Sequence, residues 1–153
     1  LEDLSRPTIV LEPGHYIVSD AGVLLLRVID VKEAAGSTWV IVDGGTNLLP
    51  DYWERREIRV ANEANAPLDR LSNVTGPLLY PHDFVAIKKN LPTVKRGDIL
   101  AVFDAGAYTL SQSHQFLYPR PPAVIIDVEG QVTEIRKKEG YKDVMRMDRL
   151  GSK

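Results

Sequence analysis

Tyr108 is the first residue in the sequence whose type and setting suggest a binding role. It follows residues 104–107, where one glycine and two alanines leave little bulk around the backbone. Small residues next to a strand often mark a bulge or a place where a ligand approaches the main chain. A phenol there can pack its ring and present its hydroxyl group to a phosphate or carboxylate. A tyrosine that only covers the edge of the core is the competing interpretation, and spacing alone favours it.

Glu12 is the second residue whose position suggests chemistry. It ends the apolar run at residues 7–11 and stands directly before Pro13 and Gly14. Barrels and open sheets of the α/β class place functional groups where a strand gives way to such a turn. A solvated loop carboxylate explains the same pattern equally well.

Several other chemistries lack their motifs. The three histidines, His15, His82 and His114, lie far apart in the sequence and none has a second ligand at zinc-site spacing, so we predict no metal site. There is no Gly-x-Ser-x-Gly nucleophile motif and no glycine-rich phosphate loop. The absence of cysteine excludes disulfides and thiolate metal sites and mildly favours a reducing compartment.

Composition predicts one compact domain. The 153 residues are 44% hydrophobic and 26% charged, with a net charge of -2, which favours neither disorder nor binding to nucleic acid. No apolar run approaches the roughly 20 residues that cross a bilayer, so we expect a soluble cytoplasmic protein without membrane contact. The chain opens on Leu1 rather than methionine, and we expect it to be part of a longer polypeptide.

The elements that must position these residues are mostly short strands. A continuous apolar run at 99–103 predicts a strand buried on both faces, and residues 7–11 predict a second buried strand. Further patterns predict a helix running into a strand at 16–26, strands at 59–60, 71–79 and 84–87, hairpins at 23–31 with 38–42 and at 123–127 with 131–135, and a terminal helix at 139–150. About nine strands with helix only near the ends predict a mainly β fold, a Greek-key-like barrel or sandwich with a short N-terminal helix and a possible C-terminal helix.

Six sequence blocks, taken in order, resemble one family. They are EPGHYIV (12–18), VDGGTN (42–47), GPLLYPHD (76–83), GD (97–98), DAGAY (104–108) and PRPP (119–122). Together they are similar to the C-terminal half of the fold-type III pyridoxal-phosphate decarboxylases, the relatives of diaminopimelate, ornithine and arginine decarboxylases. The resemblance covers about residues 7–136, nearly the whole chain.

The resemblance implies a domain that works only with other parts of an enzyme. Residues 1–22 would be the last strand and helix of an upstream alanine-racemase-like barrel, and residues 23–153 would be the C-terminal β domain. The family binds pyridoxal 5'-phosphate, acts on small amino acids and builds its active site across a homodimer. Its cofactor-bonding lysine lies in the barrel, so this chain alone is expected to contain no catalytic residue and to be inactive. Its apolar surface at 7–11 and 16–26 should make it associate.

The resemblance also assigns residues to the cofactor. The family's glutamate at the position of Glu12 faces the pyridine nitrogen and keeps it protonated as CO2 leaves. The tyrosine that matches Tyr108 lies by the cofactor phosphate. Gly14 and His15 belong to the same cofactor-binding block, although the family's usual arginine is His15 here, and histidine is only partly charged near neutral pH.

Substrate contacts are implied for the block at 76–83, which in the family reaches into the partner subunit's site. The implied substrate-binding residues are Leu79, Tyr80 and Asp83. Leu79 replaces the usual cysteine and cannot transfer a proton, Tyr80 replaces an acidic residue that reads a distal amine, and residues 48–50 lack the family's arginine. These departures argue against diaminopimelate and ornithine as substrates.

Two alternatives stay open at this point. The losses at His15 and Leu79 are consistent with a non-catalytic binding or assembly module derived from the family. An amino-acid racemase of the same fold type is a weaker alternative, because the block at 76–83 looks like that of the decarboxylases.

Overall fold

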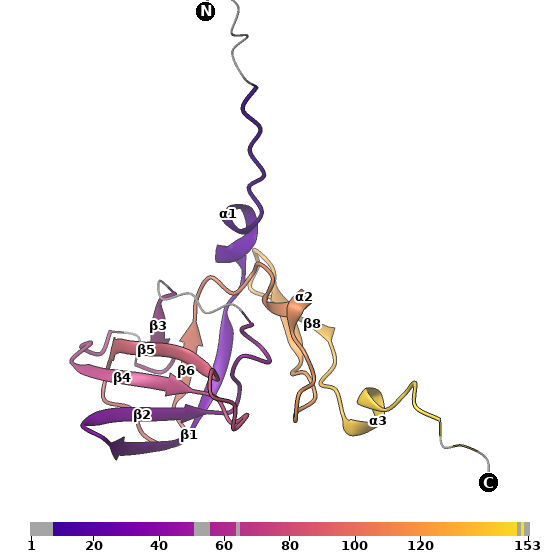
Figure 1. Cartoon of the computed structure of the whole chain (residues 1–153). Helices are drawn as coiled ribbons and strands as arrows, with labels where there is room; N and C mark the ends of the chain where they lie inside the picture. The colour runs from indigo at the N-terminus through magenta and orange to yellow at the C-terminus, as the bar shows by residue number, and fades with distance from the viewer. Residues whose placement is uncertain (1–7, 51–55, 64, 150, 152–153) are drawn as a thin grey trace, which may run out of the picture.

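The main body of the protein is a strongly curved β sheet. The computed structural model describes residues 8–50, 56–63, 65–149 and 151 (Figure 1). Six strands form one nearly closed, barrel-like sheet in the order β3-β6-β1-β2-β4-β5. They are β1 (Leu24–Ala34), β2 (Ser37–Val42), β3 (Ile58–Val60), β4 (Arg70–Thr75), β5 (Phe84–Leu91) and β6 (Ile99–Val102). The predicted mainly β barrel or sandwich is therefore confirmed.

The long strand β1 belongs to both halves of this sheet. Residues 24–27 pair with β6, residues 28–34 pair with β2, and the register shifts between Val28 and Asp30. A β-bulge bends a strand and increases its twist, so this shift lets one strand turn the corner of the barrel. The β1–β2 hairpin that the sequence predicts is confirmed, and it turns at Ala35 and Gly36, both with positive φ.

The core fills the inside of the barrel with branched aliphatic side chains. Val40, Val42, Val74, Leu100 and Val102 are completely buried. They alternate with outward residues along β2, while in β6 the last three residues are all buried. The prediction that the run at 99–103 is a buried strand is thus confirmed, and β6 delivers residues 103–108 to one end of the barrel.

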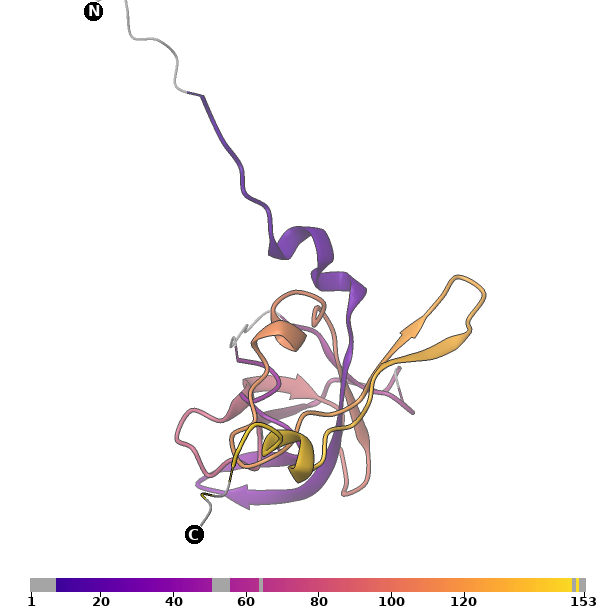
Figure 2. The same ribbon diagram turned by 90° about the vertical axis from the view of Figure 1, so that its right-hand side faces the viewer.

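The N-terminal segment leaves the barrel. Helix α1 (His15–Val18) and the 3-10 turn η1 (Ser19–Ala21) lead into β1, and residues 8–14 run outward from them (Figure 2). Val10 is 74% exposed, and none of the described strands pairs with this segment. The buried strand predicted at 7–11 is therefore not seen, because no described neighbour supplies its hydrogen bonds; residues 1–7 lie outside the described part of the chain.

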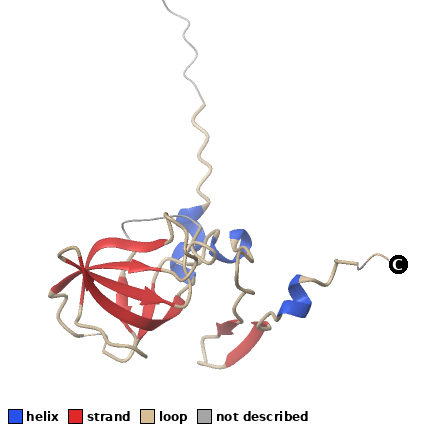
Figure 3. Cartoon of the chain, turned by 60° about the horizontal axis from the view of Figure 1, so that its bottom comes forward, coloured by secondary structure: helices blue, strands red, loops and turns tan. Residues whose placement is uncertain are grey.

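A second, two-stranded sheet follows the barrel. Strands β7 (Ala123–Ile126) and β8 (Val132–Arg136) form the predicted hairpin, which stands beside the barrel (Figure 3). The predicted terminal helix shrinks to α3 (Tyr141–Val144), and the short helix α2 (Thr109–Gln112) was not predicted. No helix among the described residues has the length and apolar character to span a membrane.

One ion pair on the barrel surface links β1 to β4 and should make stability depend on pH. Glu33 accepts hydrogen bonds from the Arg70 guanidinium and from Thr38 Oγ1, the latter at 3.0 Å. The Arg70 bond, and after it the Thr38 hydroxyl, lower the pKa of Glu33 below its ordinary value. A carboxylate whose pKa is lower in the folded state stabilises that state above its unfolded pKa, and this contribution is lost as pH falls through the folded pKa.

We expect Glu33→Gln to reduce the free energy of unfolding modestly near neutral pH, because both partners are exposed and screened by solvent. The difference from the wild type should vanish in acid, where Glu33 is protonated in both states. Urea unfolding from neutral pH into acid measures this difference in the free energy of unfolding, with Glu129→Gln in the β7–β8 turn as control. A difference that stays constant with pH would contradict the lowered pKa of Glu33 as its cause.

Candidate functional site

The loop between β6 and α2 is held against the 3-10 turn by backbone contacts. Ala105 N donates to Gly22 O at 2.9 Å, and Gly106 N donates to Ser19 O at 2.8 Å. A Cβ on Gly106 would lie 1.9 Å from Val18 O. The small residues at 104–107 therefore make room for the protein's own main chain, whereas the sequence suggested a bulge or an approaching ligand.

These two backbone hydrogen bonds place Tyr108 beside the first turn of α1. Tyr108 has a positive φ of 61° and is 46% exposed. A Cβ on Gly14 would lie 2.7 Å from Tyr108 Oη, and the Tyr108 and His15 ring centroids are 6.1 Å apart. Three of the four predicted cofactor residues, Gly14, His15 and Tyr108, thus meet, and Glu12 is exposed on the same segment.

A buried carboxylate organises the second region. Asp83 is 2% exposed and accepts hydrogen bonds from Thr46 N and Leu78 N, both at 2.8 Å. Cβ atoms on Gly45 and Gly76 would lie 1.8 and 2.4 Å from its carboxylate oxygens. Asp83 therefore ties the turn after β2 to the loop after β4. Its carboxylate is engaged by backbone amides, an arrangement that favours a positioning role over direct substrate contact.

The tip of the loop after β4 points outward. Leu79 has a positive φ of 54° and is 97% exposed, an unusual conformation for a branched residue. Asp83 N donates to Tyr80 O at 3.0 Å, which closes the loop on itself. Leu79 is thus presented to the surroundings, while Tyr80 turns back toward the barrel.

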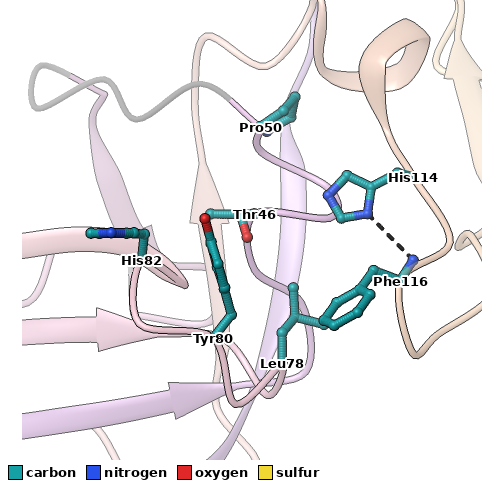
Figure 4. A pocket seen from close by; sticks show the side chains of 7 residues that line it. All are labelled: Thr46, Pro50, Leu78, Tyr80, His82, His114 and Phe116. Carbon is teal, nitrogen blue, oxygen red and sulfur yellow. Dashed lines mark hydrogen bonds between the residues drawn. The ribbon is translucent and has the colours of Figure 1, made fainter.

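Tyr80 lines a cavity of about 550 Å³ (Figure 4). The walls come from the turn after β2, the loop after β4 and the segment after α2. The lining residues are Thr46, Pro50, Leu78, Tyr80, His82, His114 and Phe116. Neither Leu79 nor Asp83 is among them, although both share the loop with Tyr80.

Two backbone hydrogen bonds fix His114 at the cavity. Its own N–H donates to Asn47 O at 2.9 Å, and Phe116 N donates to His114 Nδ1 at 3.3 Å. On the opposite side, the rings of Tyr80 and His82 meet edge to face with centroids 5.6 Å apart. The polar groups of the cavity are therefore held in place before any ligand arrives.

Sequence reasoning missed most of these lining residues. His82 and His114 were considered only as metal ligands, and within the described residues no group of three or more His, Asp or Glu side chains could hold a metal ion. Two recognised blocks carried the available signal: Thr46 lies inside VDGGTN, and Leu78, Tyr80 and His82 lie inside GPLLYPHD. Pro50 and Phe116 carried none, because their proximity depends on how distant segments pack.

Comparison with known proteins gives consistent results. Residues 15–106 match the family described as "Pyridoxal-dependent decarboxylase, C-terminal sheet domain". The chain is 38% identical over 149 residues to the diaminopimelate decarboxylase of Methanothermobacter thermautotrophicus, covering 94% of this chain and 34% of the relative. It is 34% identical over 146 residues to that of Bacillus subtilis, covering 93% and 33%.

Solved structures are similar as well. The crystal structure of diaminopimelate decarboxylase from M. jannaschii superposes with a TM-score of 0.81 at 31% identity, over 95% of this chain and 34% of that one. The same enzyme in complex with L-lysine gives a TM-score of 0.79 at 30% identity, over 95% and 34%. The chain spans about a third of the length of the relatives that it matches.

Proposed function

This chain belongs to the pyridoxal-dependent decarboxylase family, as its C-terminal sheet domain, and on that premise we propose that it completes the cofactor and substrate sites of an amino-acid decarboxylase. The proposal includes a barrel domain that binds the cofactor covalently. This barrel would correspond to the additional length of the relatives. We call the assembly of that barrel with this chain the complete protein. The contact between Gly14 and Tyr108 is the observation that carries the proposal.

The residues around this contact fit pyridoxal phosphate. The half-exposed Tyr108 offers a hydroxyl donor, and Gly14 lets that hydroxyl come close to the backbone, since a Cβ on Gly14 would lie 2.7 Å from Tyr108 Oη. A phosphate accepts hydrogen bonds from such donors. The His15 ring lies next to Tyr108, with ring centroids 6.1 Å apart.

Glu12 has a different role from this group. When bound, pyridoxal phosphate supplies an electron-accepting ring that makes loss of CO2 from an amino acid possible. Glu12, exposed two residues before Gly14, would hold a proton on the ring nitrogen through a charge-assisted hydrogen bond. This carboxylate would therefore act on the chemistry, and Tyr108 on retention of the cofactor.

The loop tip at Leu79 supports an active site shared between two subunits. A large apolar side chain that is 97% exposed, held by a backbone conformation that costs free energy, is suited to contact another chain. We propose that this chain forms a homodimer in the complete protein, with Leu79 and Tyr80 facing the partner's substrate.

The complete protein, supplied with pyridoxal phosphate, should release CO2 from an amino acid, whereas this chain alone should not. Tyr108→Phe should weaken retention of the cofactor by about 1 to 3 kcal/mol, roughly 5- to 150-fold in Kd, because one donor to the phosphate is lost. Turnover at saturating cofactor should change little. Cofactor titration and CO2 release measure the two effects separately.

Tyr118→Phe is the matched control, since Tyr118 is a similarly exposed tyrosine on the connection after α2. Equal cofactor affinity in Tyr108→Phe and the wild type would remove Tyr108 from the proposed site. CO2 release from no amino acid, together with failure to bind pyridoxal phosphate, would refute the proposed function itself.

A further inference from the structure

We infer that the cavity beside Tyr80 receives the distal end of an acidic amino acid, one whose side chain ends in a carboxylate. The inference rests on the proposed function, since it names the substrate class of the same site. It differs from the chemistry of L-lysine, which the M. jannaschii relative holds in its crystal structure.

The charges at the cavity disfavour a substrate with a distal ammonium group. None of the described residues that line it is a carboxylate or a permanent cation. An ammonium group brought out of water needs a hydrogen-bonded negative partner, and without one its burial is costly. The described walls would leave such a group without a counter-charge.

His114 is prepared to donate a hydrogen bond instead. Because Phe116 N–H donates to His114 Nδ1, that nitrogen carries no proton. In an imidazole whose Nδ1 is an acceptor, Nε2 carries the proton. Figure 4 shows this second nitrogen on the side of the ring that faces the cavity, so His114 presents an N–H to an acceptor inside it.

Tyr80 supplies a second donor, its hydroxyl group. Its ring stands against His82 edge to face, and its oxygen lies at the cavity beside Thr46 (Figure 4). The Thr46 hydroxyl is engaged with Asp83 Oδ1 at 3.3 Å, so the lining donors that remain for a ligand are Tyr80, His114 and His82. Tyr80 and His114 line the cavity from different loops, and two such donors suit the two oxygens of a carboxylate.

The remaining walls suit the methylene groups of such a substrate. Leu78, Pro50 and Phe116 are apolar, and they line the same cavity as the two donors. Ligand sites commonly combine apolar walls with a few placed polar groups. The cavity therefore fits an aliphatic chain that ends in an acidic group.

The test compares substrates of the complete protein. Its kcat/KM for CO2 release should be at least about 10-fold higher with glutamate or 2-aminoadipate than with ornithine or lysine. His114→Leu should lower the value for the acidic substrates by about 10- to 100-fold, because a donor to a charged group is lost. Tyr80→Glu should shift the preference toward lysine and ornithine by supplying a negative charge. Tyr118→Phe, outside the cavity, should leave the ratio unchanged.

A second measurement does not depend on turnover. Glutarate, which carries a carboxylate but no amino group, should shift the NMR signals of His114 and Tyr80 in the complete protein, and cadaverine should not. Faster CO2 release from ornithine or lysine, or shifts caused by cadaverine alone, would overturn the inference and leave the proposed function intact. If no amino acid releases CO2 and pyridoxal phosphate does not bind, the proposed function fails, while the glutarate measurement still decides what the cavity binds.

Discussion

Glu12→Gln should lower turnover of the complete protein by about 100-fold or more, and excess pyridoxal phosphate should not restore it. Glutamine keeps the size of the side chain but removes the negative charge that would favour a protonated cofactor ring. Cofactor binding should change much less, because in the proposed site the phosphate would be held elsewhere, beside Tyr108 and Gly14. Single-turnover CO2 release at saturating cofactor measures the loss.

Glu129→Gln, in the exposed turn between β7 and β8, is the matched control and should retain full activity. The contrast with Tyr108→Phe is informative, because only the tyrosine variant should recover when cofactor is added in excess. Full activity of Glu12→Gln in an active wild-type background, or equal recovery of both variants, would show that Glu12 does not face the cofactor ring.

Asp83→Ala should destabilise the chain by about 3 to 5 kcal/mol. The substitution leaves Thr46 N–H and Leu78 N–H buried without their shared acceptor and opens a gap between Gly45 and Gly76. Asp83→Asn should also destabilise the chain. The NH2 group of asparagine cannot accept a hydrogen bond, so one of the two backbone N–H groups loses its acceptor. Urea unfolding followed by circular dichroism measures the change.

Asp127→Ala supplies the comparison for this second experiment. Its carboxylate also accepts backbone hydrogen bonds, from Glu129 N and Gln131 N, but it lies in an exposed hairpin turn. Its loss should cost about 1 kcal/mol or less, because water replaces the missing acceptor. If the two variants were equally stable, Asp83 would not be the anchor between the two loops.

Strand β6 shows what could be predicted from sequence. Its continuous apolar run can be buried on both faces only in the middle of a sheet, so its place was predictable. The family motifs also located Gly14 and Tyr108 without any structural information. Residues 7–11 were harder, because a strand is stabilised by its neighbours and none of the described segments lies beside them.

The cavity could not be predicted for a different reason. Thr46, Tyr80 and His114 come from three segments, each more than thirty residues from the next, and no local pattern records that they meet. The run at 104–107 was misleading in a similar way. Small residues indicate that something approaches the backbone, but whether a ligand or η1 does so is decided by tertiary packing.

The double pairing of β1 has a consequence for folding kinetics. The first residues of β1 pair with β6, about 75 positions later in the chain, while the rest of β1 pairs with β2. The loop that carries Tyr108 leaves β6, and the turn that carries Thr46 leaves β2. Contacts at such long sequence separation form late, since loop closure opposes them. The amides of Ala105 and Gly106, in the loop that carries Tyr108, should therefore gain protection from exchange later than the amides of the local β1–β2 hairpin, so that a nascent chain orders this loop after the hairpin.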